Sequence, residues 1–505
     1  MNSVLKDLIF CIILVTALTL PVAHADEWEK VNTNGFGDTD NQSSFPMIIF
    51  HDDLYLGTWN DEGSEIRMIS EETHSDWKQV NINGFGAPEN SHSISMEVFD
   101  DNLYVAVLND GGGEVWFTGD GTSWNQLNID GFGLNHMRVR AMSTFSSHGS
   151  NQHLYMATDN EEGAQTWMTS NGMDWLLMDE NGFDDANNTS VYCMAVFNND
   201  LYLGTANQQS GTQIWKTKGG ITWVQANTSG FGTSSNLASY SMGTFKNYLY
   251  VGTVNHLTGT QVWRTSDGNN WHQSNIDGFG DPENSCSYCM TVFNDSLYMG
   301  TGNSAARVWR TEDGIIWEQA NDDGFGNTDN KRIHSLAVFD GDLYAGTGNR
   351  KGTEIWRCNL SEVGGDKPCF LEMVFKNEPQ KLDALRMLRD NMLGTNLKGS
   401  RVIELYYRYS SELMDICNAC PDLKERTIEL LKGLIPGLVL LSEGRKKNLS
   451  ASMTRKLVSL SEEYSNAAST GLKLAVGKIV GELKRGNLST FLRPEEMETV
   501  KENIK

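Results

Sequence analysis

The chain reads Leu249-Tyr250-Val251-Gly252-Thr253-Val254-Asn255 near its centre, and close variants of this stretch occur seven times in its 505 residues. The repeated Leu-Tyr pairs begin at Leu54, Leu103, Leu154, Leu201, Leu249, Leu297 and Leu343. A Gly-Phe pair recurs with the same period, and a Trp lies eight residues before each of its Phe residues. Repeats of 46 to 51 residues made of short strand-like runs are typical of β-propeller blades.

Each repeat predicts four strands, A to D. In the sixth repeat, alternating or β-branched runs cover 288–293 (A), 297–301 (B), 307–311 (C) and 317–321 (D). A D-type segment, 28–32, precedes the first A strand, and the last repeat ends at its C strand near Trp356. The two incomplete ends together make one blade, which leaves no open sheet edge. The sequence therefore predicts a mainly β chain: a seven-bladed propeller over residues 26–358, closed by the N-terminal strand.

The first 25 residues are typical of a signal peptide. An apolar run covers 8–20, and Ala23-His24-Ala25 forms a small-x-small cleavage site. No other stretch is apolar enough for a transmembrane helix, so the mature chain is expected to lack one. We expect a secreted, periplasmic or cell-surface protein, with an uncleaved anchor as the alternative.

The charge is unevenly distributed. Up to Leu360 the chain has 17 basic and 45 acidic residues, although its C-terminal part is nearly balanced. An acidic surface repels nucleic acid and anionic lipid. It suits cations, neutral glycans or basic protein patches as partners; solubility is the simpler explanation.

After Trp356 the composition changes. Residues 359–368 form a Gly- and Pro-containing linker, and apolar residues then recur at helical spacing, which predicts a helical C-terminal domain over 369–505. Two disulfides are conceivable, one between Cys358 and Cys369 and one between Cys417 and Cys420. The cysteines are too sparse for a disulfide framework.

The C-to-D hairpins resemble those of Asp-box propellers, an architecture shared by sialidases and many secreted binding proteins. Thr, Asp, Gly and an aromatic residue recur in 118–124, 265–271 and 311–317, whereas Asn171 and Gly219 replace the Asp in two repeats. The resemblance implies a structural role for these boxes, away from any catalytic face.

Residues 369–413 resemble the CFI-box C-terminal domain of many secreted bacterial proteins. The matching residues are Cys369-Phe370-Leu371, Leu385-Arg386-Met387-Leu388-Arg389-Asp390, Asn396, Gly399 and Leu405-Tyr406-Tyr407-Arg408-Tyr409-Ser410. The resemblance implies that the tail serves sorting or attachment to the cell envelope.

The B–C and D–A loops of a four-stranded meander emerge on one face. An Asn begins every B–C loop, and we interpret it as closing its own turn. A single asymmetric ligand site is expected where the repeats diverge, at Asn135, His136, Arg138, Asp184 and Asp185. Oxygen-rich D–A loops also suit calcium, with Asp38, Asp281 and Asp329 as candidate ligands.

Three functions remain open. The first is a non-catalytic scaffold that binds a glycan or a protein through the B–C/D–A face. The second is a sialidase-like or other glycoside hydrolase, although the arginine cluster and paired acids that such chemistry uses are not evident in the repeats. The third is a purely structural surface protein. No nucleophile elbow, zinc motif or phosphate loop occurs in the sequence.

Overall fold

The computed structural model describes residues 27–109, 111–127, 138–146, 151–179 and 181–359, with Cys420, Asp422, Glu425, Arg426 and Glu429. Contacts group Ala25–Val363 into one compact unit, separate from the rest of the chain. Among the described helices none is long and apolar enough to cross a membrane. The signal peptide, most of the linker and nearly all of the helical domain lie outside the described residues, so they stay predictions. Cys369 and Cys417 also lie outside, so both disulfides are untested.

The described strands pair antiparallel in sets of four, which we number along the chain. Set 1 contains β2 (Ser43–Phe50), β3 (Asp53–Trp59), β4 (Ile66–Ser70) and β5 (Lys78–Gln79). Set 2 contains β6 (His92–Phe99), β7 (Asn102–Leu108), β8 (Glu114–Thr118) and β9 (Asn125–Gln126). Set 3 contains β10 (Arg138–Phe145), β11 (His153–Asp159), β12 (Thr166–Thr169) and β13 (Trp175–Asp179).

The later strands repeat this pattern. Set 4 contains β14 (Asn188–Phe197), β15 (Asp200–Asn207), β16 (Ile214–Thr217) and β17 (Val224–Gln225). Set 5 contains β18 (Ala238–Phe245), β19 (Tyr248–Val254), β20 (Val262–Thr265) and β21 (His272–Gln273). Set 6 contains β22 (Cys286–Phe293), β23 (Ser296–Gly302), β24 (Arg307–Thr311) and β25 (Glu318–Gln319). Set 7 contains β26 (Arg332–Phe339), β27 (Asp342–Gly348), β28 (Ile355–Cys358) and β1 (Trp28–Lys30).

The N-terminal strand β1 completes set 7. Trp28 lies opposite Cys358, and Lys30 lies opposite Trp356. This pairing between the two ends of the repeat region was predicted from the incomplete first and last repeats. It covers the edge of β28 that would otherwise be open.

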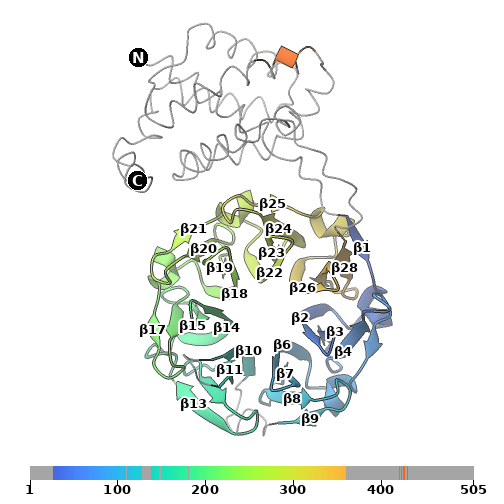
Figure 1. Cartoon of the computed structure of the whole chain (residues 1–505), viewed down its shortest axis with the longest axis vertical. Helices are drawn as coiled ribbons and strands as arrows, with labels where there is room; N and C mark the ends of the chain where they lie inside the picture. Colours follow the sequence, from blue (N-terminus) through green and yellow to red (C-terminus); the bar gives the residue numbers. More distant parts are fainter. Residues whose placement is uncertain are drawn as a thin grey trace. The chain divides into compact units, whose positions relative to one another are not determined.

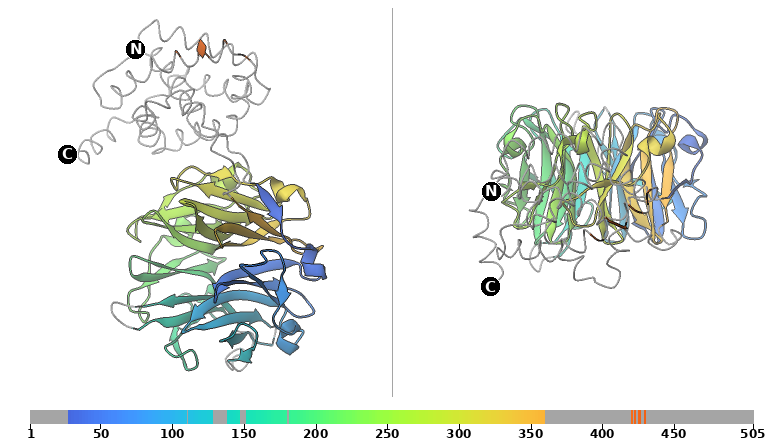
Figure 2. Two further views of the ribbon diagram at one scale, coloured as in Figure 1. Left: turned by 45° about the vertical axis from the view of Figure 1, so that its right-hand side comes forward. Right: turned by 90° about the horizontal axis from the view of Figure 1, so that it is seen from above.

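The sets are arranged around an axis, with the first strand of each set innermost (Figures 1 and 2). A single residue pair links most neighbouring sets, such as Val254 with Cys286 between sets 5 and 6. Ser43 and Gly348 link set 1 to set 7 in the same way. The prediction of a mainly β chain with propeller architecture is confirmed.

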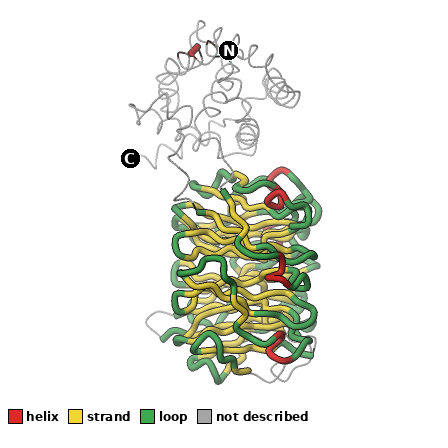
Figure 3. The backbone as a smooth tube through the Cα atoms, turned by 90° about the vertical axis from the view of Figure 1, so that its right-hand side faces the viewer, coloured by secondary structure: helices red, strands yellow, loops and turns green. Residues whose placement is uncertain are grey.

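The Gly-Phe pairs lie in short helical turns that join one set to the next. These turns are η1 (Asn34–Gly37), η2 (Asn83–Gly86), η4 (Ser229–Gly232), η5 (Asp277–Gly280) and η6 (Asp323–Gly326). The described turns gather on one side of the strand sets when these are seen edge-on (Figure 3). The D–A loops therefore share a face.

Phe279 illustrates why an unfavourable backbone is retained in these turns. Its φ is +56°, a left-handed conformation that costs a non-glycine residue about 1–2 kcal/mol. The ring is stacked on Trp309 at a centroid distance of 4.3 Å and meets Trp317 edge-on at 5.7 Å. Both Trp residues belong to set 6, whereas Phe279 follows set 5. Each aromatic pair contributes about 0.5–1.5 kcal/mol beyond area burial, which offsets the strain.

The Leu-Tyr pairs also pack one set against the next. Gly314, in the C-to-D hairpin of set 6, has a φ of +74°, and a Cβ there would lie 1.8 Å from the hydroxyl oxygen of Tyr250 in set 5. Only glycine fits both the backbone and the contact. Gly121, Gly172, Gly220 and Gly268 occupy equivalent positions beneath a Tyr of the preceding set. The hairpin glycines are thus required by packing between sets.

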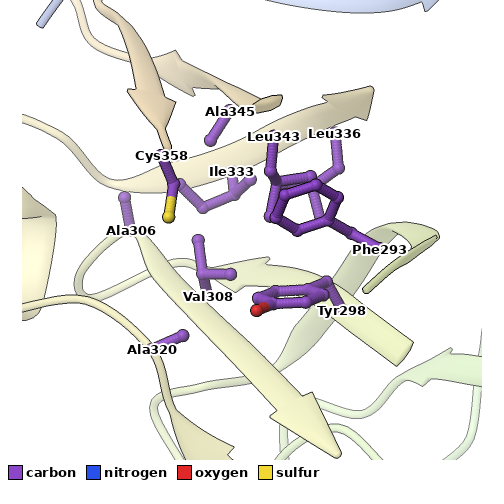
Figure 4. Packing of buried hydrophobic residues seen from close by; sticks show 10 residues of the cluster. All are labelled: Phe293, Tyr298, Ala306, Val308, Ala320, Ile333, Leu336, Leu343, Ala345 and Cys358. Atoms are coloured by element: carbon purple, nitrogen blue, oxygen red, sulfur yellow. The ribbon is translucent and has the colours of Figure 1, made fainter. Parts of the chain in front are cut away.

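Side chains between the sets form the core. The largest described cluster joins sets 6 and 7, where Phe293, Tyr298, Val308, Ile333 and Leu343 are nearly inaccessible to solvent (Figure 4). Similar clusters lie between the other sets, so each sheet is buried on both faces. This repeated packing makes the inner strands a rigid frame for the residues that they carry.

Candidate functional site

The B–C loop Asn residues have a structural role in six of the seven sets. Asn255 Oδ1 accepts hydrogen bonds from the backbone N–H groups of Leu257 and Thr258, both at 3.0 Å. Asn60, Asn109, Asn160, Asn207 and Asn349 close their turns in the same way. The turn-closing interpretation is confirmed for these residues.

A second Asn, from the D–A loop, is bonded to the first. Asn255 Nδ2 donates to Asn236 Oδ1 at 2.9 Å, and Asn236 Nδ2 donates to Gly230 O and to Gln261 Oε1. Equivalent Asn–Asn bonds join Asn60 to Asn41, Asn109 to Asn90, Asn207 to Asn188 and Asn349 to Asn330. Buried amide pairs of this kind fix the loops and leave few groups for a ligand.

The three candidate calcium ligands lie in separate D–A loops. Asp281 forms an ion pair with Arg307 at 2.7 Å, and Asp329 forms one with Lys351 at 2.7 Å. Asp38 Oδ2 accepts a hydrogen bond from Asn60 Nδ2 at 3.1 Å. Within the described ranges, no three His, Cys, Asp or Glu residues are grouped as a metal ion would require. Calcium binding therefore stays a prediction.

Three of the five candidate ligand residues near sets 3 and 4 lie within the described residues. Asn135 and His136 lie outside the described residues. Arg138 begins β10, and its backbone N–H donates to Asp159 Oδ1 at 3.1 Å. Asp184 is exposed in the loop before β14. Burial raises the pKa of Asp185, but hydrogen bonds from Asn187, Asn207 and Gln213 outweigh it and lower the pKa overall.

A different set of residues comes together at the inner strands. Each inner strand has a β-bulge near the end that follows the D–A loop, where its pairing register shifts. A bulge leaves a residue unpaired and redirects its side chain. Those residues, five positions before each strand's Phe, are Phe45, Ile94, Arg140, Tyr192, Tyr240, Tyr288 and His334.

Five of these bulge residues form a continuous aromatic arc across sets 4, 5, 6, 7 and 1. Ring centroids are 4.4 Å apart for Tyr192 and Tyr240, and 5.9 Å apart for Tyr240 and Tyr288. They are 4.6 Å apart for Tyr288 and His334, and 4.4 Å apart for His334 and Phe45. Beneath the B–C/D–A loop face the arc thus follows the inner strands through most of the ring.

Arginines flank the arc. The Arg140 guanidinium lies 5.4 Å from the Tyr192 ring centroid and is held by Asp159, with Nε to Oδ2 at 2.8 Å. Across the seven inner strands the only Asp or Glu is Glu97, whereas Arg138, Arg140 and Arg332 are all present. The inner strands are therefore cationic in a unit whose surface is strongly acidic. Burial raises the pKa of Glu97, and hydrogen bonds from Thr144 oppose this shift in part.

His334 is buried without a hydrogen-bond partner on either ring nitrogen. Its side chain is 8% exposed. Burial lowers the pKa of His334 to about 3, with smaller contributions from Arg332 and His92, so the imidazole is neutral at physiological pH. The Nε atom of Arg332, two residues earlier, is also buried without a hydrogen-bond partner. Such groups are uncommon in proteins.

Set 6 departs from the other sets at this point. Asn303, with a φ of +136°, donates to Ser285 and Cys286 and accepts a hydrogen bond from the Tyr288 hydroxyl at 3.1 Å. Its B–C loop lacks the positive-φ glycine found in the other six. Asn284 Oδ1, which would accept the Asn–Asn bond, is left without a hydrogen-bond partner.

No protein-family model matches the chain, and a search of curated proteins found no match. Among solved structures, it is similar to the WD40 β-propeller domain of Doa1, with 12% identity over 66% of this chain and 98% of that chain and a TM-score of 0.44. U3-55K is 13% identical over 68% and 100% of the two chains, with a TM-score of 0.43. Sqt1 of Saccharomyces cerevisiae is 11% identical over 60% and 80%, with a TM-score of 0.40.

The aromatic arc was missed in the sequence analysis, although a signal for it exists. The column five residues before each A-strand Phe carries large side chains but is not constant among the repeats. A repeat position that only supports packing between sets carries the same residue in every repeat, as the Gly-Phe pair does. A repeat position whose side chains are large but differ between repeats suggests a surface used for recognition.

Proposed function

We propose that this chain is a non-catalytic binding protein, a closed seven-bladed propeller that holds a glycan against the inner end of its B–C/D–A loop face. The observation that carries the proposal is the aromatic arc of Phe45, Tyr192, Tyr240, Tyr288 and His334. Aromatic rings offer apolar faces to sugar rings, while tyrosine hydroxyls and imidazole nitrogens offer hydrogen bonds.

The arc tyrosines Tyr192, Tyr240 and Tyr288 pack against a buried cluster of Ala206, Ala238, Val254 and Cys286, yet none of the three is fully buried. Burial raises the pKa values of Tyr240 and Tyr288, so both hydroxyls stay protonated as hydrogen-bond donors. Partly exposed aromatic side chains on a rigid frame bind a ligand at little entropic cost.

Charge supports binding over hydrolysis. Glycoside hydrolysis generally uses two carboxyl groups about 5–9.5 Å apart. Glu97 is the only carboxylate on the inner strands, and nearby Asp159 is bonded to Arg140. The proposal therefore assigns recognition, and no turnover, to this face.

The test is a glycan array on the purified chain, followed by titration calorimetry on the strongest hit. Tyr240→Ala is expected to weaken binding about tenfold or more, the effect of removing an aromatic anchor. Tyr248→Ala, a partly buried tyrosine at the opposite end of strand set 5, is the matched control and should bind normally. Hydrolysis of the hit, abolished by one carboxylate substitution, would favour the glycosidase alternative. Absence of any glycan ligand would favour a purely structural protein.

The remaining parts of the proposal rest on sequence. A binding protein of the cell surface would be exported through residues 1–25. A helical, CFI-box-like tail would then serve its sorting or attachment to the envelope. The Asp-box-like hairpins fit a structural role, since Thr265 Oγ1 and Asp267 Oδ1 accept hydrogen bonds from backbone N–H groups of their own turn.

A further inference from the structure

We propose that the junction of strand sets 6 and 7 is a subsite for one carboxylate group, carried by a uronic acid residue of the bound glycan. The inference rests on the proposed function and specifies the class of sugar. Its residues are Arg332 and His334 on β26, with Ser304, Tyr288 and Asn284 of set 6 and its preceding loop.

Unsatisfied polar atoms concentrate at this junction. Arg332 Nε, both ring nitrogens of His334, Ser304 Oγ and Asn284 Oδ1 are buried and lack hydrogen-bond partners within the described chain. A buried polar group without a hydrogen-bond partner destabilises the fold. Five of the buried unsatisfied side-chain atoms of the described residues thus lie at this one junction, which suits a bound polar group. Arg332 Nε donates, His334 and Ser304 Oγ can each donate and accept, and Asn284 Oδ1 accepts, which suits a carboxylate beside a hydroxyl.

Backbone contacts hold these residues together. Gly302 lies opposite Arg332, and the Asn303 N–H donates to Lys331 O at 3.0 Å, so the B–C loop of set 6 is fixed to the start of β26. The Tyr288 ring is stacked on His334, and its hydroxyl is held by Asn303. A Cβ at Gly348 would lie 3.0 Å from His334 Nε2, so this glycine makes room for the imidazole.

The charge of the site selects a single carboxylate. Arg332 provides the positive charge, and an Arg Nε–H is well suited to a carboxylate oxygen. His334 is neutral and donates from one nitrogen only, so the site has too little charge for a phosphate or a polyanion. The acidic surface outside repels long polyanions as well. The adjoining aromatic arc favours a sugar ring over an acidic peptide as the carrier.

The experiment is calorimetric titration of the full chain with D-galacturonate, D-glucuronate, D-galactose and N-acetylglutamate. We expect at least one uronate to bind about tenfold or more tightly than neutral galactose. Arg332→Gln should remove this preference. Arg350→Gln removes the same charge from an exposed position on the B–C loop of set 7, and it should keep the preference. Melting temperatures of all variants establish that they are folded, and His334→Gln tests the same subsite independently.

The outcomes separate the two proposals. If galactose binds as tightly as the uronates and Arg332→Gln changes nothing, the carboxylate subsite is wrong and the glycan-binding function stands. If N-acetylglutamate binds as well as a uronate in an Arg332-dependent way, the sugar class is wrong. If none of the sugars binds to the chain, and the array finds no glycan, both proposals are wrong.

Discussion

The indole Nε1 of Trp28 donates a hydrogen bond to the backbone carbonyl oxygen of Ala320 at 2.9 Å, although 292 residues separate them. The same bond joins Trp124 to Val80 and Trp271 to Ala226 between neighbouring sets. Trp28 also meets Phe325 edge-on at 5.2 Å. Five other D-strand Trp residues meet a Phe in the same way: Trp77, Trp124, Trp223, Trp271 and Trp317. The N-terminal strand therefore makes the contacts of an ordinary D strand.

Trp28→Ala should destabilise the whole ring, because it removes an aromatic pair and a hydrogen bond at the closing set. We expect a loss of about 3 kcal/mol in the free energy of unfolding, at the lower end for Trp→Ala because Trp28 is only partly buried. Urea denaturation followed by fluorescence measures it. Glu27→Ala, exposed just before β1, is the control, and equal stability of the two variants would contradict closure by β1.

Gly268→Ala should be strongly destabilising. Gly268 has a φ of +73°, and a Cβ would lie 1.9 Å from the Tyr202 hydroxyl oxygen. Strain and overpacking together are expected to cost about 2–4 kcal/mol. Adding Tyr202→Phe should restore part of the loss, because it removes the oxygen that clashes. Gly219→Ala is the control, since nothing lies within 4 Å of its Cβ position. If the changes in melting temperature caused by Gly268→Ala and Tyr202→Phe simply add in the double variant, the predicted contact is wrong.

The box aspartates should contribute to acid sensitivity. Hydrogen bonds from the backbone N–H groups of Asn270 and Asn269 lower the pKa of Asp267 well below its usual range. An unfolded Asp titrates near pH 4, so the stabilisation is present above about pH 4 and is lost as the pH falls further. Asp267→Asn should therefore lessen the fall in melting temperature between pH 5 and pH 3.

Asn171 provides the reciprocal test. Its Oδ1 accepts the same two turn hydrogen bonds, from Met173 and Asp174. Asn171→Asp should make the melting temperature fall more steeply in acid than that of the wild-type protein. If both variants follow the wild-type pH profile, the box carboxylates do not contribute to acid sensitivity.

Calcium binding at the D–A loops should depend on the local ion pairs. Arg307 bridges Asp281 and Asp323, each at 2.7 Å, so a cation at Asp281 must displace it. We expect calcium to raise the melting temperature of Arg307→Gln more than that of the wild-type protein, by mass action. Calorimetry with calcium and with chelator measures both shifts. If both proteins give identical melting curves with calcium and with chelator, the prediction of calcium binding at this face is wrong.

Removing residues 369–505 should leave the ring folded, because every described strand pairing is complete by Cys358. The truncated protein is expected to keep its melting transition and to change its distribution between cell fractions. Unchanged fractionation would contradict a sorting role for the tail. Loss of the melting transition would show that the ring needs the tail.

The repeats predicted the strands and their order because the same local pattern occurs in every copy. The C strand of the sixth repeat was placed correctly at Arg307–Thr311, and the N-terminal pairing followed from the missing D strand. The D strands were predicted too long: Glu318–Gln319 replaces 317–321, since the strand ends where the chain turns toward the Gly-Phe pair. Repetition fixes what is shared between copies.

The candidate site was harder to predict because it depends on how copies differ. Asn303 has the same sequence signal as Asn255, yet it turns toward Tyr288. The bulges that bring Tyr192, Tyr240 and His334 together are register shifts between paired strands, and a single strand contains no sign of them. Contacts between neighbouring sets therefore decide the site.

The pairing of β1 with β28 also sets an order of events during biosynthesis. β1 is synthesised before every other described strand, yet its partner residues 356–358 are among the last of the ring to be made. Loop closure over some three hundred residues costs about 5 kcal/mol of chain entropy, so this contact does not form early. Until then β28 presents an unpaired edge to any passing strand. Folding of the ring is therefore completed only after translation of the repeats has ended. Before β1 pairs, the open edge of β28 is the part of the ring that a chaperone would protect.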